Sequence, residues 1–255
     1  MKVFRLIGIL SLLVFSFYLT DFVTELAISS NPLYKTIKNN SDNYGSKCVN
    51  AIIDNNTIIP GIKGKEINEI ESFLNMKDFG EFNKNYLIYD FVKPEISLED
   101  NKDKVIISGN KSLRNISLLV KDNFVILDYL EDNRINYSKL IKLNSEINSK
   151  ESINIENDEN SFEQLNILLN KKKLNKNICI LNFSNIKVCK DLEYYIVKYS
   201  YELSNNNIYS IINRLNNGDI IFVDNNLSLE NFKIILNKIK SKDLEIKYLS
   251  EIIKE

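Results

Sequence analysis

Asp122 and Asp224 are the two residues of this sequence whose types and positions best suit cation chemistry. Asp122 follows the apolar segment Leu118-Leu119-Val120 and Lys121, and Asp224 follows Ile220-Ile221-Phe222-Val223. If both segments are parallel strands, the two carboxylates meet at one edge of a sheet, where they suit a hard cation such as calcium or magnesium. Acidic residues in such places also cap the helices that follow strands. We favour the capping interpretation, and the metal pair stays an alternative.

The chain contains no histidine, so it has no imidazole for metal binding or for general acid–base catalysis. Its three cysteines lack C-x-x-C spacing, which excludes a zinc-knuckle site. Cys179 lies at the end of an apolar run and Cys189 in the segment after it, so they either form a disulfide or remain two buried thiols. Cys48 has no partner if that disulfide forms. We expect no cofactor other than the divalent cation considered above.

The elements that must position these residues follow from hydrophobic patterning. Residues 111–255 alternate buried-type strands with helices, which indicates a parallel sheet covered on both sides. We expect strands over 116–120, 135–141, 178–181, 194–199, 220–223 and 244–249, and helices over 124–133, 161–171, 185–190, 208–215 and 227–240. This length is too short for a full eight-fold (β/α) barrel, which typically needs about 250 residues. A trimmed, irregular (β/α) barrel is therefore predicted.

Residues 1–28 predict a membrane anchor. Lys2 and Arg5 precede an apolar run from Leu6 to Leu19. This pattern is typical of a signal anchor that leaves the rest of the chain outside the cytoplasm, as a single-pass protein of the cell membrane. A cleaved signal peptide is the alternative.

Two segments connect the anchor to the alternating region. Residues 29–47 are polar and predict a linker. Residues 48–110 predict a small α+β module, with a hairpin around Asp54-Asn55-Asn56, a helix over 66–77 and strands over 85–92 and 104–108.

The last forty-odd residues carry a family resemblance. The turn and strand over 216–225, the helix sequence IILNKIKSK and the closing IKYLSEII resemble the C-terminal end of a NodB-type polysaccharide deacetylase domain. The resemblance covers residues 111–255. It implies an α/β fold with a trimmed, irregular (β/α) barrel of the polysaccharide-deacetylase type, here preceded by the small α+β module and an N-terminal transmembrane helix.

The same resemblance implies a metal site that this sequence has lost. In the family, one aspartate and two histidines hold a divalent metal, a neighbouring aspartate is the base and a further histidine is the acid. Lys121 occupies the base position, Asp122 the position of the metal aspartate and Asp224 that of the last histidine. The H-x-x-x-H motif belongs in 147–163 and an arginine motif in 180–185, and neither is present. We therefore expect a catalytically degenerate domain.

Three functions remain open at this point. Basic and acidic residues nearly cancel, 33 against 34, so a nucleic-acid partner is not indicated. The leading hypothesis is a membrane-anchored protein of the cell envelope whose deacetylase-like domain binds glycan or another envelope protein. The alternatives are a cell-wall carbohydrate deacetylase or hydrolase with a rebuilt carboxylate site, and a purely structural partner in an envelope complex.

The residues at the carboxyl ends of the strands discriminate between these functions. Clustered carboxylates favour an enzyme, exposed aromatic rings favour glycan binding, and an apolar plug favours scaffolding. The tyrosines that are candidates for stacking on sugar rings, or alternatively for half-buried packing, are Tyr194, Tyr195, Tyr199 and Tyr201.

Overall fold

The computed structural model describes residues 2–255 and, outside residues 2–13, 18 and 21, their side chains. The chain forms two units. Unit 1 consists of residues 2–48 and Lys63–Lys93, and unit 2 consists of Val49–Ile62 and Pro94–Glu255. Residues 48–110, which the sequence predicts as one module, are divided between the two units.

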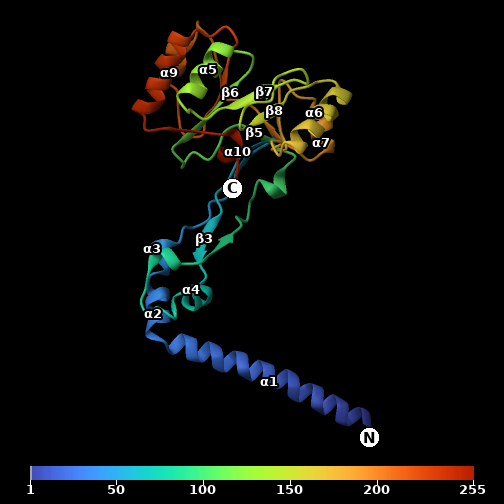
Figure 1. Ribbon diagram of the computed structural model, residues 1–255, viewed down its shortest axis with the longest axis vertical. Helices are drawn as coiled ribbons and strands as arrows, with labels where there is room; N and C mark the ends of the chain where they lie inside the picture. Colours follow the sequence, from blue (N-terminus) through green and yellow to red (C-terminus); the bar gives the residue numbers. More distant parts are fainter. Residues whose placement is uncertain (1) are drawn as a thin grey trace. The chain divides into compact units, whose positions relative to one another are not determined.

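Unit 1 is a small α+β unit (Figure 1). Its elements are α1 (Lys2–Ser30), α2 (Pro32–Asn39), α3 (Ser41–Tyr44), β3 (Gly64–Ile67), α4 (Glu69–Met76), the 3-10 helix η1 (Lys84–Tyr86) and β4 (Tyr89–Val92). Strands β3 and β4 pair antiparallel. The core of the unit contains Leu33 and Ile37 from α2 and Phe73 and Met76 from α4, together with Leu87.

The first part of unit 1 differs from the predicted linker over 29–47. Asn31 caps α2 by accepting the Leu33 N–H at 2.9 Å, and Pro32 occupies its first turn. Leu33 and Ile37 are four residues apart, so they share one helix face and are buried together. A segment that is polar in composition therefore still forms helices, because its few apolar residues have helical spacing.

The predicted anchor over residues 1–28 coincides with α1. Ile28, in its last turn, packs against the core of unit 1. Seven of its described large apolar side chains are 47–70% exposed, namely Val14, Phe15, Phe17, Leu19, Phe22, Val23 and Leu26. Among the described residues, no helix combines the length and the hydropathy that a membrane span requires. Most of the apolar run that predicts the anchor lies outside the described side chains.

Unit 2 has the predicted α/β class. Its strands are β1 (Ile52–Asp54), β2 (Thr57–Ile59), β5 (Val105–Ile106), β6 (Asn115–Val120), β7 (Ser138–Ile141), β8 (Ser152–Asn154), β9 (Ile178–Ile180), β10 (Tyr195–Val197), β11 (Tyr201–Leu203), β12 (Ile220–Val223) and β13 (Glu245–Lys247). Its helices are η2 (Glu99–Asn101), α5 (Phe124–Asp132), α6 (Glu159–Lys171), α7 (Ile186–Asp191), α8 (Ile208–Ile212), α9 (Leu229–Ser241) and α10 (Leu249–Ile252).

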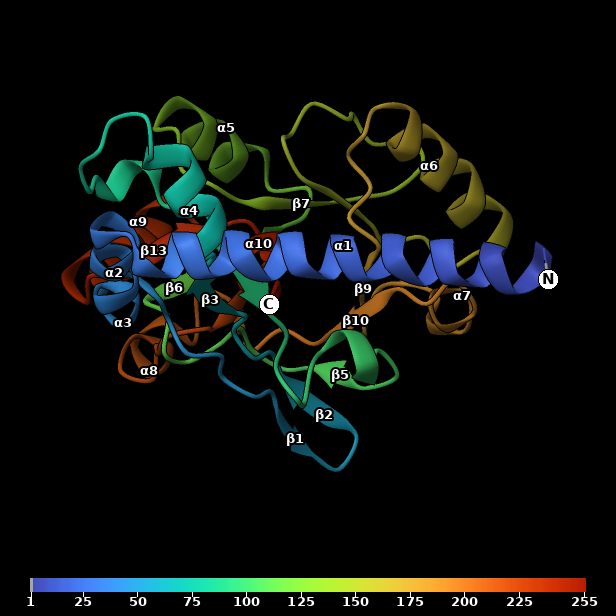
Figure 2. The ribbon, with the colours of Figure 1, turned by 90° about the horizontal axis from the view of Figure 1, so that it is seen from below.

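These strands form two sheets. One has the order β11-β12-β6-β7-β8, with β13 also paired to β6, and the other has the order β1-β2-β5-β10-β9. Apart from the β1–β2 hairpin, every ladder in the two sheets is parallel. Figure 2 shows the hairpin at the edge of its sheet, beside β5.

The two sheets share one apolar core instead of forming one hydrogen-bonded ring. Leu119 of β6 and Phe222 of β12 lie in the same buried cluster as Ile180 of β9 and Val197 of β10. At one junction the chain crosses between sheets, because Lys198 N–H donates to Ile106 and Ser200 N–H donates to Ile220. At the other, β8 and β9 are bridged by a side chain, as the Ser184 Oγ donates to the Asn154 carbonyl at 2.9 Å.

Helices cover the outer faces of the sheets. Alternate residues of β6, Ile116, Leu118 and Val120, pack against α5, α8 and α9, whereas Leu119 faces the shared core. Figure 1 shows α5 and α9 together on one side of unit 2 and α6 and α7 on the other. A disulfide joins Cys179 of β9 to Cys189 of α7, with an S–S distance of 2.00 Å, and Cys48 is free and exposed.

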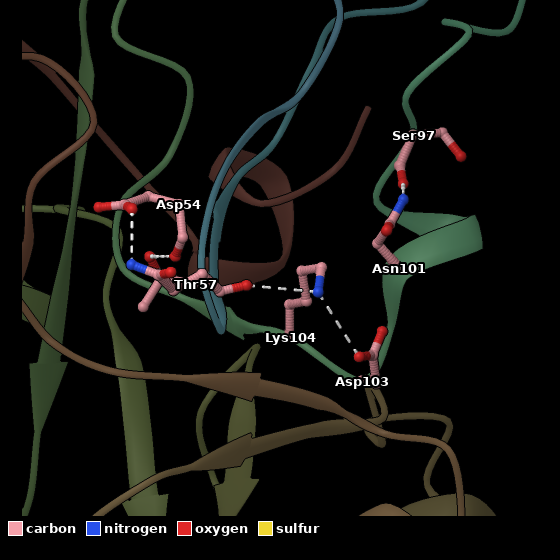
Figure 3. Close-up of polar contacts among 7 residues, drawn as sticks. Asp54, Thr57, Ser97, Asn101, Asp103 and Lys104 are labelled. Carbon is pink, nitrogen blue, oxygen red and sulfur yellow. Dashed lines mark hydrogen bonds and ion pairs between the residues drawn. The ribbon is translucent and has the colours of Figure 1, made fainter.

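Two turns of unit 2 make close contacts with neighbouring loops. Asn55 lies in the hairpin turn between β1 and β2, and Lys104 lies just before β5. The Lys104 Nζ is 3.4 Å from the Asn55 carbonyl and 3.7 Å from the Asp103 carboxylate (Figure 3). Before β12, Gly218 has φ +81°, and a Cβ there would lie 2.4 Å from the Gly109 carbonyl oxygen. Glycine is therefore required at the predicted turn before β12.

Sequence prediction missed some boundaries in both units. The helix predicted over 66–77 begins at Glu69, because Glu66 and Ile67 pair with Asp90 and Tyr89 in the ladder of β3 and β4. Strands β8 and β11 are absent from the predicted set.

Candidate functional site

The carboxyl ends of four strands meet in unit 2. The register pairs Val120 of β6 with Val223 of β12, so Lys121, Asp122 and Asp224 lie at one edge, as the sequence predicts. In the other sheet, Ile180 of β9 pairs with Val197 of β10. We call the residues that follow these strands, Lys121, Asp122, Phe183, Tyr199 and Asp224, the strand mouth.

Aromatic rings join the two sheets at the strand mouth. Phe183 and Tyr199 have ring centroids 6.2 Å apart, and each packs on Phe222, at 5.0 Å and 5.4 Å respectively. Phe222 is buried, whereas Phe183 and Tyr199 are half-buried. The Tyr199 hydroxyl donates to Glu202 at 3.3 Å and accepts from Asn182 at 3.5 Å. The strand mouth therefore offers two partly accessible rings with polar groups beside them.

Lys121 faces these rings. Side chains alternate along a strand, so Lys121 continues the inward set that includes Leu119. It is half-buried, and its Nζ lies 5.7 Å from the centroid of the Phe183 ring, within the range of a cation–π interaction. The position that the resemblance assigns to the catalytic base thus holds a cation packed on an aromatic face.

Asp122 is exposed and has φ +47°, a left-handed conformation that aspartate tolerates better than most residues. The next residue, Asn123, is buried and joins the two loops at this edge. Its Oδ1 caps α5 by accepting the Ile126 N–H, and its Nδ2 donates to the carbonyls of Asp224, Asn225 and Leu227 at 3.0–3.1 Å. Asn123, not Asp122, is therefore the helix cap of this loop.

Asp224 is half-buried and stabilises its own loop. Its Oδ1 accepts the N–H of Asn226 at 3.2 Å, an Asx turn, and Ser228 caps the following helix α9. In the described part of the chain, no group of three or more histidine, cysteine, aspartate or glutamate residues is placed to hold a metal ion. The strand mouth does not fit the histidine–aspartate zinc site that the resemblance implies, and the pairing of Asp122 with Asp224 around a hard cation stays a prediction.

The other predicted residues lie away from the strand mouth or have structural roles. Tyr194 accepts a hydrogen bond from Asn175 at 2.9 Å, and Tyr201 donates to the Arg214 carbonyl. Burial raises the pKa of Tyr195, whose ring lies under Lys102. Of the four candidate tyrosines, only Tyr199 belongs to the strand mouth.

In the acidic tract 151–163, Glu151 is buried and accepts hydrogen bonds from Ser138 and Ser250. Asp158 caps α6, and the hydrogen bonds from Ser161 lower its pKa. Glu151 and Asp158 of this tract therefore have structural roles.

Sequence reasoning missed Phe183 of the strand mouth and the structural role of Glu156. Phe183 lies in the 180–185 segment, to which the resemblance assigns an arginine motif and no aromatic residue. Glu156 follows β8, and its carboxylate accepts the Leu143 N–H at 2.8 Å. The buried Ile153 and Ile155 just before it alternate with polar residues, a period-two signal that was available in the sequence.

No protein-family model matches the chain. Over 101 residues the chain is 35% identical to the uncharacterized protein YlxY of Bacillus subtilis, a match that spans 39% of this chain and only 31% of that protein.

The fold has solved relatives. BA3943, a CE4 family pseudoenzyme from Bacillus anthracis, superposes with a TM-score of 0.58 over 88% of this chain and 95% of that chain, at 17% identity. A BA3943 mutant with restored enzymatic activity gives 0.56 over 88% and 98%, at 16% identity. At these identities the likeness concerns the fold, so the chain has a divergent, deacetylase-like α/β fold of the kind found in a CE4 pseudoenzyme.

Proposed function

We propose that this chain is a membrane-anchored protein of the cell envelope whose deacetylase-like unit binds glycan at the strand mouth without hydrolysing it. The observation that carries the proposal is the packing of Lys121 on Phe183, beside Tyr199. An aromatic face suits the C–H face of a sugar ring, and Lys121, Asn182 and Glu202 supply donors and acceptors for its hydroxyls.

Loss of catalysis follows from the residue types at the strand mouth. Deacetylation by a metal-bound water needs a base to activate the water and an acid to protonate the leaving amine. The base position holds Lys121, a cation, and the acid position holds Asp224, whose carboxylate is used in an Asx turn. The sequence contains no histidine that could replace either group.

The membrane part of the proposal depends on α1. Phe15, Phe17 and Phe22 are 61–70% exposed on this helix, and a set of exposed apolar rings favours transfer to an apolar environment such as a membrane. Lys2 and Arg5 at its start favour an orientation with the rest of the chain outside the cytoplasm. We expect the full chain to sediment with membranes and a chain without residues 1–28 to stay in solution. Processed protein free in the growth medium would contradict the anchor.

Glycan binding can be measured locally because the chain contains no tryptophan. Phe183→Trp keeps an aromatic face at the strand mouth and provides a single tryptophan, which can be excited apart from the tyrosines. Titration of the full chain in detergent with a soluble tetramer of N-acetylglucosamine should give a saturable change in its emission. In that background, Tyr199→Ala should weaken binding about 2- to 12-fold, and Tyr209→Ala, on the exposed face of α8, should not.

The same preparation tests catalysis. We expect no zinc-dependent release of acetate from the tetramer or from peptidoglycan fragments. Metal-dependent release that is abolished by Asp122→Ala or Asp224→Ala would replace this proposal with the alternative of a rebuilt carboxylate enzyme. If no glycan changes the emission of Phe183→Trp, the proposal of a glycan ligand would be replaced by that of a protein partner at the strand mouth.

A further inference from the structure

Unit 1 contains a concave surface whose residues are separate in sequence from the strand mouth of unit 2. A cavity of about 720 Å³ is lined by four aromatic residues, Tyr44, Phe79, Phe82 and Tyr86, together with Glu81, Asn83 and Lys84. We call this cavity the aromatic pocket. Its volume lies within the range of small-molecule binding sites.

The segment that carries most of the aromatic pocket is held in place by the fold. After α4 ends, the N–H groups of Phe79 and Gly80 donate to the Met76 carbonyl, and Gly80 turns the chain with φ +70°. The Asn83 N–H donates to the sulfur of the buried Met76, and its Oδ1 caps η1. The Tyr86 carbonyl accepts from Asn75 at 2.9 Å. The rings are thus presented by a segment anchored at both ends.

The aromatic rings form two pairs. Phe79 stacks on Tyr86, with centroids 5.2 Å apart and planes at 21°, and Tyr44 of α3 packs against Phe82 at 6.0 Å. Phe79 remains 64% exposed, Tyr86 39% and Tyr44 36%. Stacked rings that keep this much accessible surface offer an aromatic platform, which is a common device for binding a flat apolar face.

The polar residues of the pocket identify the class of ligand. Glu81 and Lys84 are exposed, and no described residue forms a hydrogen bond or an ion pair with either side chain. An acyl chain in the pocket would bury these charges without partners, which is costly. A strongly charged ligand would meet one residue of its own sign. A neutral polyhydroxy ligand avoids both costs, because its hydroxyls can bind both charges while its C–H face covers the rings.

We propose that the aromatic pocket of unit 1 is a second carbohydrate site, which takes a neutral sugar ring through Phe79 and Tyr86 and contacts its hydroxyls through Glu81 and Lys84. This site does not depend on the strand mouth, since its residues all belong to unit 1.

The test uses Phe79→Trp, again as the single tryptophan of the chain. Its matched control is Phe91→Trp, on β4 of the same unit, because Phe91 is 71% exposed and does not line the pocket. Circular dichroism checks that both variants fold. Titration of the full chain in detergent with a tetramer of N-acetylglucosamine and with cellotetraose should change the emission of Phe79→Trp saturably and leave Phe91→Trp unchanged.

Further variants locate the ligand. In the Phe79→Trp background, Tyr86→Ala should weaken binding about 2- to 12-fold. Tyr199→Ala, at the strand mouth, should have no effect, so failure of either site is distinguished from failure of the other.

Two results would overturn the proposal. One is an absence of saturable change with both oligosaccharides at millimolar concentration. The other is a response of Phe79→Trp to vesicles containing phosphatidylglycerol but not to oligosaccharides, which would assign the rings to the membrane surface.

Discussion

The Nζ of Lys121 lies 5.7 Å from the centroid of the Phe183 ring, which brings the end of β6 against the end of β9 across two different sheets. Lys121→Ala removes both this cation–π interaction and the packing of the lysine stem. We expect the free energy of unfolding to fall by about 0.5–2 kcal/mol. Lys142→Ala, an exposed lysine after β7, is the matched control and should have little effect.

A double-mutant cycle separates the pair from its surroundings. Lys121→Ala and Phe183→Leu should show a coupling energy of about 0.5–1 kcal/mol in denaturant unfolding. A coupling energy near zero would mean that the two side chains are neighbours without a net interaction. The packing of Lys121 on Phe183 could then no longer support the proposed function.

Asn123 should contribute more to stability than any charged residue of the strand mouth. It is buried, caps α5 and donates to three carbonyls of the loop after β12. Asn123→Ala removes the cap and the three hydrogen bonds to the loop, of which the one to the Leu227 carbonyl is buried, so the free energy of unfolding should fall by about 2–4 kcal/mol.

Asn123→Asp tests the two roles separately, because it keeps the acceptor for the helix cap but places a carboxylate against three carbonyl oxygens. It should be destabilised as well. Asn225→Ala, in the same loop and exposed, serves as the control. If Asn123→Asp were as stable as the unsubstituted protein, the cap would be the only important role of Asn123.

The elements that sequence patterning predicts best are those with long apolar periodicity. The helix predicted over 227–240 is α9 (Leu229–Ser241), and its apolar residues Phe232, Ile235 and Ile239 recur at helical spacing and are buried. The strand predicted over 220–223 is β12, with all four residues buried. Parallel pairing of β6 and β12 then places Lys121 and Asp224 at one edge, which is why this part of the site could be predicted.

The missed strands are short and polar. In β8, the buried side chains of Ser152 and Asn154 have hydrogen-bond partners in the flanking loop and helix: Ser149 bonds Ser152, and the Phe162 carbonyl and Asn166 accept from Asn154. These hydrogen-bond partners leave no pattern in the sequence, and the alternation of Ile153 and Ile155 with polar residues is the one periodic signal of this short strand. The aromatic group of Phe183, Tyr199 and Phe222 forms only when the ends of strands from two sheets are brought together, so it could not be predicted from the sequence alone.

The disulfide settles the alternative that the sequence left open for Cys179 and Cys189. It closes a short loop, with a separation of 10 residues, between β9 and α7. In the chain-entropy model, closing a loop of this size lowers the entropy of the unfolded chain and so stabilises the folded protein by about 2–3 kcal/mol. We expect dithiothreitol to reduce the free energy of unfolding by a similar amount and therefore to lower the denaturation midpoint. Cys48→Ser, at the exposed free cysteine, should change neither midpoint, and equal midpoints with and without reductant would contradict the expectation.

Asp219 predicts a pH dependence of stability at the opposite end of β12 from Asp224. Burial raises its pKa above the ordinary value, although a hydrogen bond from the Asn216 N–H at 2.7 Å and the charges of Lys111 and Lys242 act against this increase. The native state therefore binds this proton more tightly than the unfolded chain does. The contribution of Asp219 to stability is then greatest below the unfolded pKa of about 3.9 and decreases as the pH rises through the native pKa.

Asp219→Asn removes the titration while keeping an oxygen that can accept from Asn216. Relative to the unsubstituted protein, its free energy of unfolding should improve as the pH rises above about 4 and should level off once the pH exceeds the raised native pKa of Asp219. Urea denaturation at several pH values measures this difference, and Asp128→Asn, an exposed position on α5, is the control that should show no such trend. If the difference for Asp219→Asn grew instead towards low pH, the native carboxylate would be favoured by its hydrogen bond and its lysines more than it is disfavoured by burial, and the sign argued here would be reversed.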